Sequence, residues 1–131
     1  MHCGIPHSDR EGLRKLLAEV VHARAGSMGS VLKPMGGPGE GFISFPFKGY
    51  AFAVDLPRRS GVEELHARLE RITLDRGGRF YAAKDALMSA AGFSRMFPEL
   101  ERFRAVLRRV DPHGRFQSDM SRRLAIRPEL G

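Results

Sequence analysis

The sequence is poor in the residues that build disulfides, metal clusters and membrane spans. Cys3 is its only cysteine, which excludes an internal disulfide and a cysteine-cluster metal site and favours a reducing compartment. No apolar run approaches the length needed to cross a bilayer, and the N-terminal residues lack the hydrophobic region of a signal peptide. We therefore expect a cytoplasmic chain, compatible with peripheral attachment to a membrane as part of a larger assembly.

Motifs for independent catalysis or metal binding are also missing. The histidines contain no pair at a metal-ligand spacing such as His-Glu-x-x-His, so no metal is expected, and each is predicted to be solvated or on a helix face: His2, His7, His22, His66 and His113. There is no Gly-x-Ser-x-Gly motif, and Cys3 has too few basic neighbours to suggest a nucleophile. The glycine-rich segment 34–41 is followed by neither Gly-Lys-Ser/Thr nor a helix, so it predicts a surface loop.

The chain has a basic surplus, with 22 Lys and Arg against 15 Asp and Glu and a formal net charge of +7. Such a surplus suits nucleic acid, anionic lipid or a phosphorylated ligand, and it also arises from an arginine-rich composition alone. The basic residues are scattered over several expected helices, and no run is longer than two residues. No basic tail is present.

A pattern of strand, helix and strand occurs twice, at residues 2–33 and 50–84. The first unit has a short strand at 2–5, a capping box at Ser8–Glu11, a helix with an apolar stripe, and a strand at 30–33. The two units predict an α+β fold, with a four-stranded antiparallel, ferredoxin-like sheet and both helices on one face.

The second unit has the same order of elements. A strand is predicted at Tyr50–Leu56, then a capping box at Ser60–Glu63 and a helix that continues to Ile72. Gly77 and Gly78 end this helix, and a strand over 79–83 leads to Lys84 and Asp85. These two residues are either solvated turn residues or a charged pair aimed into a cleft.

The remaining segments are less regular. Residues 42–47 are apolar but interrupted by Pro46, which suits an edge strand or a packed loop. A C-terminal helical segment follows Lys84, with helices at 86–96 and from 97 to 110 and a turn at 111–114. Residues 115–124 are polar and basic, and we expect them to lie against another domain.

Several separated motifs, in order, resemble the C-terminal part of the decaprenylphosphoryl-β-D-ribose 2'-oxidases. These enzymes belong to the vanillyl-alcohol-oxidase class of FAD-linked oxidases, beside the D-arabinono-1,4-lactone and alditol oxidases. The segments that carry the resemblance are Ser44-Phe45-Pro46, Gly49 to Pro57, Gly77 to Asp85, Met96-Phe97-Pro98, Arg109 to Pro112 and Ser118-Asp119-Met120-Ser121-Arg122-Arg123-Leu124. The likeness covers nearly the whole chain.

The resemblance implies that residues 1–131 form the substrate-binding C-terminal domain of such an oxidase, with the N-terminal FAD-binding domain absent. FAD would be bound mainly by that other domain, in cis or in trans. Tyr81 matches a tyrosine that contacts the flavin, and Lys84 matches a lysine at the flavin and substrate. Lys33 matches a pocket lysine suited to the phosphate side of a polyprenyl-phosphate sugar.

The resemblance is incomplete at two pocket positions. Ala51 and Ala53 stand where close relatives have asparagine and cysteine, so the polyprenyl-phosphate-linked sugar is one candidate beside a sugar, a sugar alcohol or an aldonolactone. In each case hydride would pass from a CH-OH group to flavin, and the chain alone is expected to be inactive.

One alternative of a different class is a stand-alone basic ferredoxin-like module that binds RNA or another anionic partner. Phe80 and Tyr81 on a strand suit base stacking, but the glycine-aromatic signature of an RNA-recognition strand is missing. We therefore expect no nucleic acid.

Overall fold

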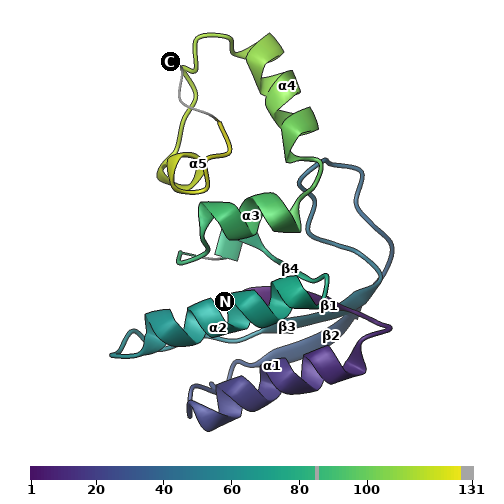
Figure 1. Ribbon diagram of the computed structural model, residues 1–131, viewed down its shortest axis with the longest axis vertical. Helices are drawn as coiled ribbons and strands as arrows, with labels where there is room; N and C mark the ends of the chain where they lie inside the picture. The colour runs from purple at the N-terminus through teal and green to yellow at the C-terminus, as the bar shows by residue number, and fades with distance from the viewer. Residues whose placement is uncertain (85, 128–131) are drawn as a thin grey trace.

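The fold is built on a four-stranded antiparallel sheet, shown in Figure 1. The computed structural model describes residues 1–84 and 86–127. The strands have the order β2-β3-β1-β4, and each neighbouring pair is antiparallel. Their bounds are β1 His2–Pro6, β2 Val31–Met35, β3 Gly49–Ala53 and β4 Arg79–Phe80. This order is that of a ferredoxin-like sheet, so the predicted α+β fold class is confirmed.

Two helices, α1 (Arg10–His22) and α2 (Val62–Asp75), lie side by side across one face of the sheet (Figure 1). Their apolar stripes meet alternate strand residues, because strand side chains point to opposite faces in turn. The buried residues shared by these helices and strands are Leu13, Leu16, Val20, Leu65, Leu69, Cys3, Ile5, Phe52, Val54 and Phe80. Burial of this apolar surface is the main stabilising contribution to the fold.

Both predicted capping boxes are wrong. The N-cap of α1 is Asp9, whose carboxylate accepts a hydrogen bond of 2.8 Å from the Gly12 N–H and forms an ion pair of 3.3 Å with Arg76. The N-cap of α2 is Gly61, which has φ 84° and makes no side-chain cap. A tertiary ion pair in one case and a left-handed glycine in the other decide where the helices start, and the local Ser-x-x-Glu pattern contains neither.

The strand predicted over residues 79–83 ends early. β4 contains only Arg79 and Phe80, and residues 82–84 form a short 3-10 helix, η1 (Ala82–Lys84). The Tyr81 N–H still donates to the His2 carbonyl at 2.8 Å, after which the Lys84 N–H turns back to the Tyr81 carbonyl at 3.0 Å. Lys84 therefore lies in a tight turn, and Asp85 lies outside the described residues.

Segment 42–47 is a packed loop, which is one of the two forms expected for it. The helices after it are α3 Ala90–Met96, α4 Leu100–Val110 and α5 Asp119–Arg123. The helix predicted from residue 86 starts later, because Ser89 is its N-cap. At the other end of the chain, Leu124 and Ile126 are buried in the core. Leu124 is the last residue of the segment 115–124, so the end of that segment packs within this domain and not against another one.

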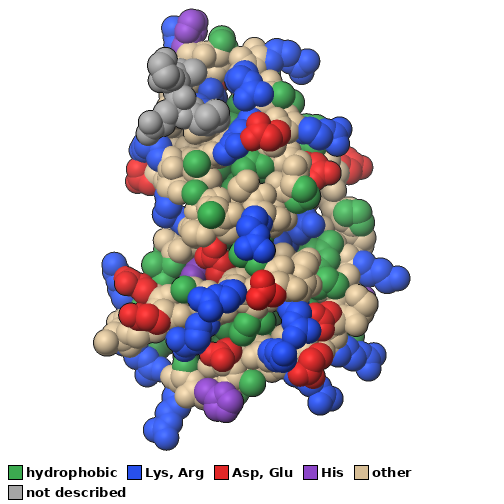
Figure 2. Space-filling view, in the orientation of Figure 1, with side chains coloured by type: hydrophobic (Ala, Val, Ile, Leu, Met, Phe, Trp, Pro, Cys, Tyr) green, Lys and Arg blue, Asp and Glu red, His purple; other side chains and the backbone are tan. Residues whose placement is uncertain are grey.

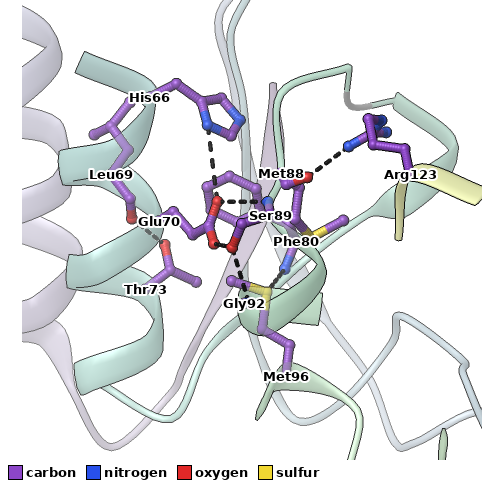
Figure 3. Close-up of polar contacts among 10 residues, drawn as sticks. All are labelled: His66, Leu69, Glu70, Thr73, Phe80, Met88, Ser89, Gly92, Met96 and Arg123. Atoms are coloured by element: carbon purple, nitrogen blue, oxygen red, sulfur yellow. Dashed lines mark hydrogen bonds and ion pairs between the residues drawn. The ribbon is translucent and has the colours of Figure 1, made fainter. Parts of the chain in front are cut away.

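The carboxylate of Glu70 joins α2 to the start of α3, as Figure 3 shows. It is almost buried and accepts hydrogen bonds from the Ser89 N–H at 3.1 Å and the Ser89 hydroxyl at 2.5 Å. The Ser89 hydroxyl in turn accepts from the Gly92 N–H at 2.9 Å. The Glu70 contact thus fixes the start of α3, and the β1–β4 pairing fixes the chain directly before Tyr81.

Gly92 is required by this contact, although a glycine inside a helix ordinarily weakens it. A Cβ at position 92 would overlap the Glu70 carboxylate and crowd the Ser89 hydroxyl. Gly92→Ala should therefore lower the free energy of unfolding by about 2 kcal/mol, the usual scale for losing hydrogen bonds to a buried charged group, even though alanine favours helix. Urea unfolding monitored by circular dichroism measures this change.

Gly36→Ala is the matched control, because a Cβ there meets no atom within 4 Å. An unfolding midpoint of Gly92→Ala equal to that of the Gly36→Ala control would contradict the assigned role of the Glu70 contact.

Candidate functional site

The candidate site lies on the sheet face opposite α1 and α2, which we call the outer face. Lys33, Ala51 and Gly4 are paired across β2, β3 and β1, and Ala53 pairs with His2 in the next outward-facing row. Intervening residues such as Cys3 and Phe52 belong to the helix-covered core. Three residues singled out in the sequence, Lys33, Ala51 and Ala53, are thereby brought onto one face.

A groove of about 510 Å³ lies over the outer face. It is lined by His2, Lys33, Met35, Ile43, Ser44, Phe45, Pro46 and Tyr81. Two of the predicted site residues, Lys33 and Tyr81, are among these residues, and Ala51 and Ala53 are not. Ala51 is fully buried beneath the groove, and Ala53 is half-buried.

The loop 42–47 builds one wall of the groove. Arg79 from β4 holds this loop, since its guanidinium donates to the Ser44 carbonyl at 3.0 Å and lies 5.0 Å from the centre of the Phe47 ring. The Phe47 ring also lies over Gly4, where a Cβ would overlap it. A close approach of loop to sheet is possible only because position 4 has no side chain.

Tyr81 lines the groove, and Lys84 lies in the η1 turn that follows Tyr81. The Tyr81 ring is half-buried, and its centre is 5.2 Å from the Phe45 ring and 5.5 Å from the His2 ring. Lys84 is exposed and does not line the groove, yet its positive charge acts on His2. Lys33 and Lys84, contributed by different elements, thus bring positive charge to the same imidazole.

His2 is a site residue that sequence reasoning placed wrongly in solvent. Its side chain is only 7% exposed, and neither ring nitrogen has a hydrogen-bond partner among the described residues. Burial lowers the pKa of His2, and the positive charges of Lys33, Lys84 and the N-terminal ammonium lower it further. Alternation with buried Cys3 would have placed His2 on the outer face, but the sequence does not show that residues 42–47 cover that face.

Other candidate chemistry is not supported by the structure. Cys3 is fully buried, which raises the pKa of its thiol to about 12, and it is therefore not activated as a nucleophile. In the part of the chain that the structure describes, no group of three or more His, Cys, Asp and Glu side chains is arranged to hold a metal ion. No helix there has the length and apolarity required to span a bilayer.

The structure weakens the case for RNA binding. Phe80 is fully buried in the core, so only Tyr81 of the two strand aromatics is available for stacking. In the face seen in Figure 2, basic side chains are interspersed with acidic ones and do not gather in one patch. A nucleic-acid backbone is generally bound by clustered cations.

Comparison with known proteins points to one group of enzymes. A family model described as D-arabinono-1,4-lactone oxidase matches residues 50–124. The chain is 34% identical over 122 residues to decaprenylphosphoryl-β-D-ribose oxidase of Mycolicibacterium smegmatis, a match that covers 93% of the chain and 26% of the relative. It is 31% identical over 125 residues to an uncharacterized protein in the mprA 5' region of Streptomyces coelicolor, covering 95% of the chain and 34% of that protein. The chain thus spans between a quarter and about a third of these curated relatives.

The unpaired imidazole of His2 should make stability depend on pH. Because the pKa of His2 is lower in the folded protein than in the unfolded chain, the unfolded state binds more protons as the pH falls. The free energy of unfolding is therefore expected to decrease as pH drops below about 6.5, and the contribution is fully present above that value. Urea midpoints measured from about pH 7.5 to about pH 5 test this slope.

His2→Gln should flatten the slope, whereas His113→Gln, at an exposed turn, should leave it unchanged. Identical pH profiles for His2→Gln and the unmodified chain would refute the assignment.

Proposed function

Because this chain belongs to the D-arabinono-1,4-lactone oxidase family, we propose that it is the substrate-binding part of an FAD-dependent oxidoreductase. Its substrate would be a sugar, a sugar alcohol or an aldonolactone, and a polyprenyl-phosphate-linked sugar is a further candidate. The observation that carries the proposal is that Lys33 of β2 and Tyr81, directly after β4, line one groove on the outer face, with Lys84 in the η1 turn that follows Tyr81.

The residues at this groove suit a flavin ring. Tyr81 offers an aromatic surface against which a planar ring system can pack, and it is held by the His2 carbonyl through its own N–H. Lys84, three residues on, supplies a positive charge near that surface. FAD would supply the acceptor of the hydride. The greater part of the cofactor would be held by an FAD-binding domain outside this chain, in the same polypeptide or in a second one.

Lys33 and Lys84 would have different tasks. Lys84, on the η1 turn, would stabilise negative charge that develops near the flavin or polarise the reacting hydroxyl. Lys33 would attract the polar or anionic end of the substrate. Both ammonium groups are exposed in this chain, so water screens them. A second domain that covers the outer face would exclude this water and strengthen both interactions.

Small residues under the groove favour a compact contact between substrate and sheet. Ala51 and Ala53 leave no polar group on this part of β3, so specificity would come from the lysines and the loop 42–47. A cytoplasmic location, at most peripheral to a membrane, agrees with the single buried thiol of Cys3.

A chimera tests the proposal. The 131-residue chain would replace the matching segment of the Mycolicibacterium smegmatis relative, which supplies the remaining length. If the chain binds substrate beside a flavin, the chimera should bind FAD, and a sugar-type substrate should bleach the visible absorbance of the flavin under anaerobic conditions. Lys84→Ala should slow this reduction by about a hundredfold or more, as expected for removal of an electrostatic stabiliser.

Lys15→Ala is the matched control, because Lys15 is an exposed lysine on α1, on the opposite side of the sheet. Thermal unfolding of each variant separates loss of function from loss of folding. Wild-type reduction rates in a folded Lys84→Ala chimera would refute the role given to Lys84.

A further inference from the structure

The buried imidazole of His2 has no assigned role in the function proposed above. Both of its nitrogens are buried and unpaired among the described residues, although it lines the groove. Buried polar groups nearly always have a partner, so an unpaired pair of ring nitrogens at a groove calls for an explanation. Packing alone would be served better by an apolar side chain, since an imidazole without partners pays a desolvation cost.

The charges around His2 are all of one sign. Lys33 lines the same groove from β2, and Lys84 contributes positive charge from η1. No carboxylate of the described residues contributes to the electrostatics of this imidazole. The charges of Lys33 and Lys84 therefore act on this imidazole with no carboxylate of the described residues to balance them, and an anion entering the groove would be attracted by both lysines.

Phe45 covers His2 on the side of the loop 42–47, and Tyr81 also contacts the imidazole. The two rings are in edge contact with centres 5.0 Å apart, and Phe45 also lies 5.2 Å from Tyr81. Phe45 belongs to the loop 42–47 and is not part of the main core cluster. It follows the segment 36–41, in which Gly36 and Gly37 have open space around them. A rotation of Phe45 would expose the imidazole without disturbing the helix-covered core.

We propose that His2 is the anchor for an oxyanion of the substrate, that its imidazole takes up one proton from solvent when the anion binds, and that Phe45 is its movable cover. This proposal rests on the proposed function and names the substrate class, a sugar derivative that carries a carboxylate or phosphate group. The bound anion offsets the charges of Lys33 and Lys84, which oppose protonation of His2. The imidazolium then donates a charge-assisted hydrogen bond to the anion.

Sulfate is a suitable probe, since it carries no proton of its own near neutral pH. The 131-residue chain, carrying any purification tag at its C-terminus, would be titrated with sulfate while the histidine ring signals are followed by NMR. The His2 signal is identified by its loss in His2→Gln. Saturating sulfate should raise the apparent pKa of His2 by about one unit, the scale of a single close charge, and leave His113 unchanged. Phe45→Ala should increase the apparent affinity for sulfate, because the cover is removed.

Absence of any sulfate-dependent change at His2, in both the unmodified chain and Phe45→Ala, would overturn the proposal. Phe45→Leu serves the same purpose if the alanine variant does not fold. No flavin takes part in this titration, so its result is independent of the chimera. A shift at His2 with an inactive chimera would contradict only the oxidase function, whereas an active chimera without the shift would contradict only the anion site.

Discussion

The central position of β1 is the constraint on which the rest of the molecule depends. This strand pairs with β3 on one side and with β4 on the other. Its alternating side chains therefore contribute to the core on one face of the sheet and to the groove on the other. The side chains of Cys3 and Ile5 point into the core beneath α1 and α2, while His2 lines the groove and Gly4 lies under the Phe47 ring on the same outer face. The packing of the core and the geometry of the candidate site thus depend on neighbouring residues of one five-residue strand.

The architecture could be predicted from the sequence because it is a matter of repeated local pattern. The apolar stripe of each helix, the two strand-helix-strand units and the stop at Gly77 are all readable from residues close together in the chain. The association of Lys33 with Ala51 and Ala53 on one face also follows, once antiparallel pairing of β2 with β3 is assumed. Each of these inferences needs only the period of a helix or strand.

The features that the sequence did not predict depend on contacts between residues that are far apart in the sequence. Asp9 is chosen as the cap of α1 partly by Arg76, which lies at the far end of α2. His2 is buried by Phe45 and Tyr81, which belong to a loop and to the residue after β4. The shortening of β4 depends on where its pairing with β1 stops. Local propensity contains none of this information, since tertiary contacts routinely override it.

The contact between Glu70 and Gly92 also constrains how this domain can change over evolution. A side chain at position 92 would occupy the space that the Glu70 carboxylate fills. A larger residue at 92 is therefore tolerated only when residue 70 is shorter or adopts a different rotamer. A shortened residue at 70, however, would leave the start of α3 without its acceptor. Positions 70 and 92 should therefore vary together among related sequences, because they lie on two helices, α2 and α3, and share one contact.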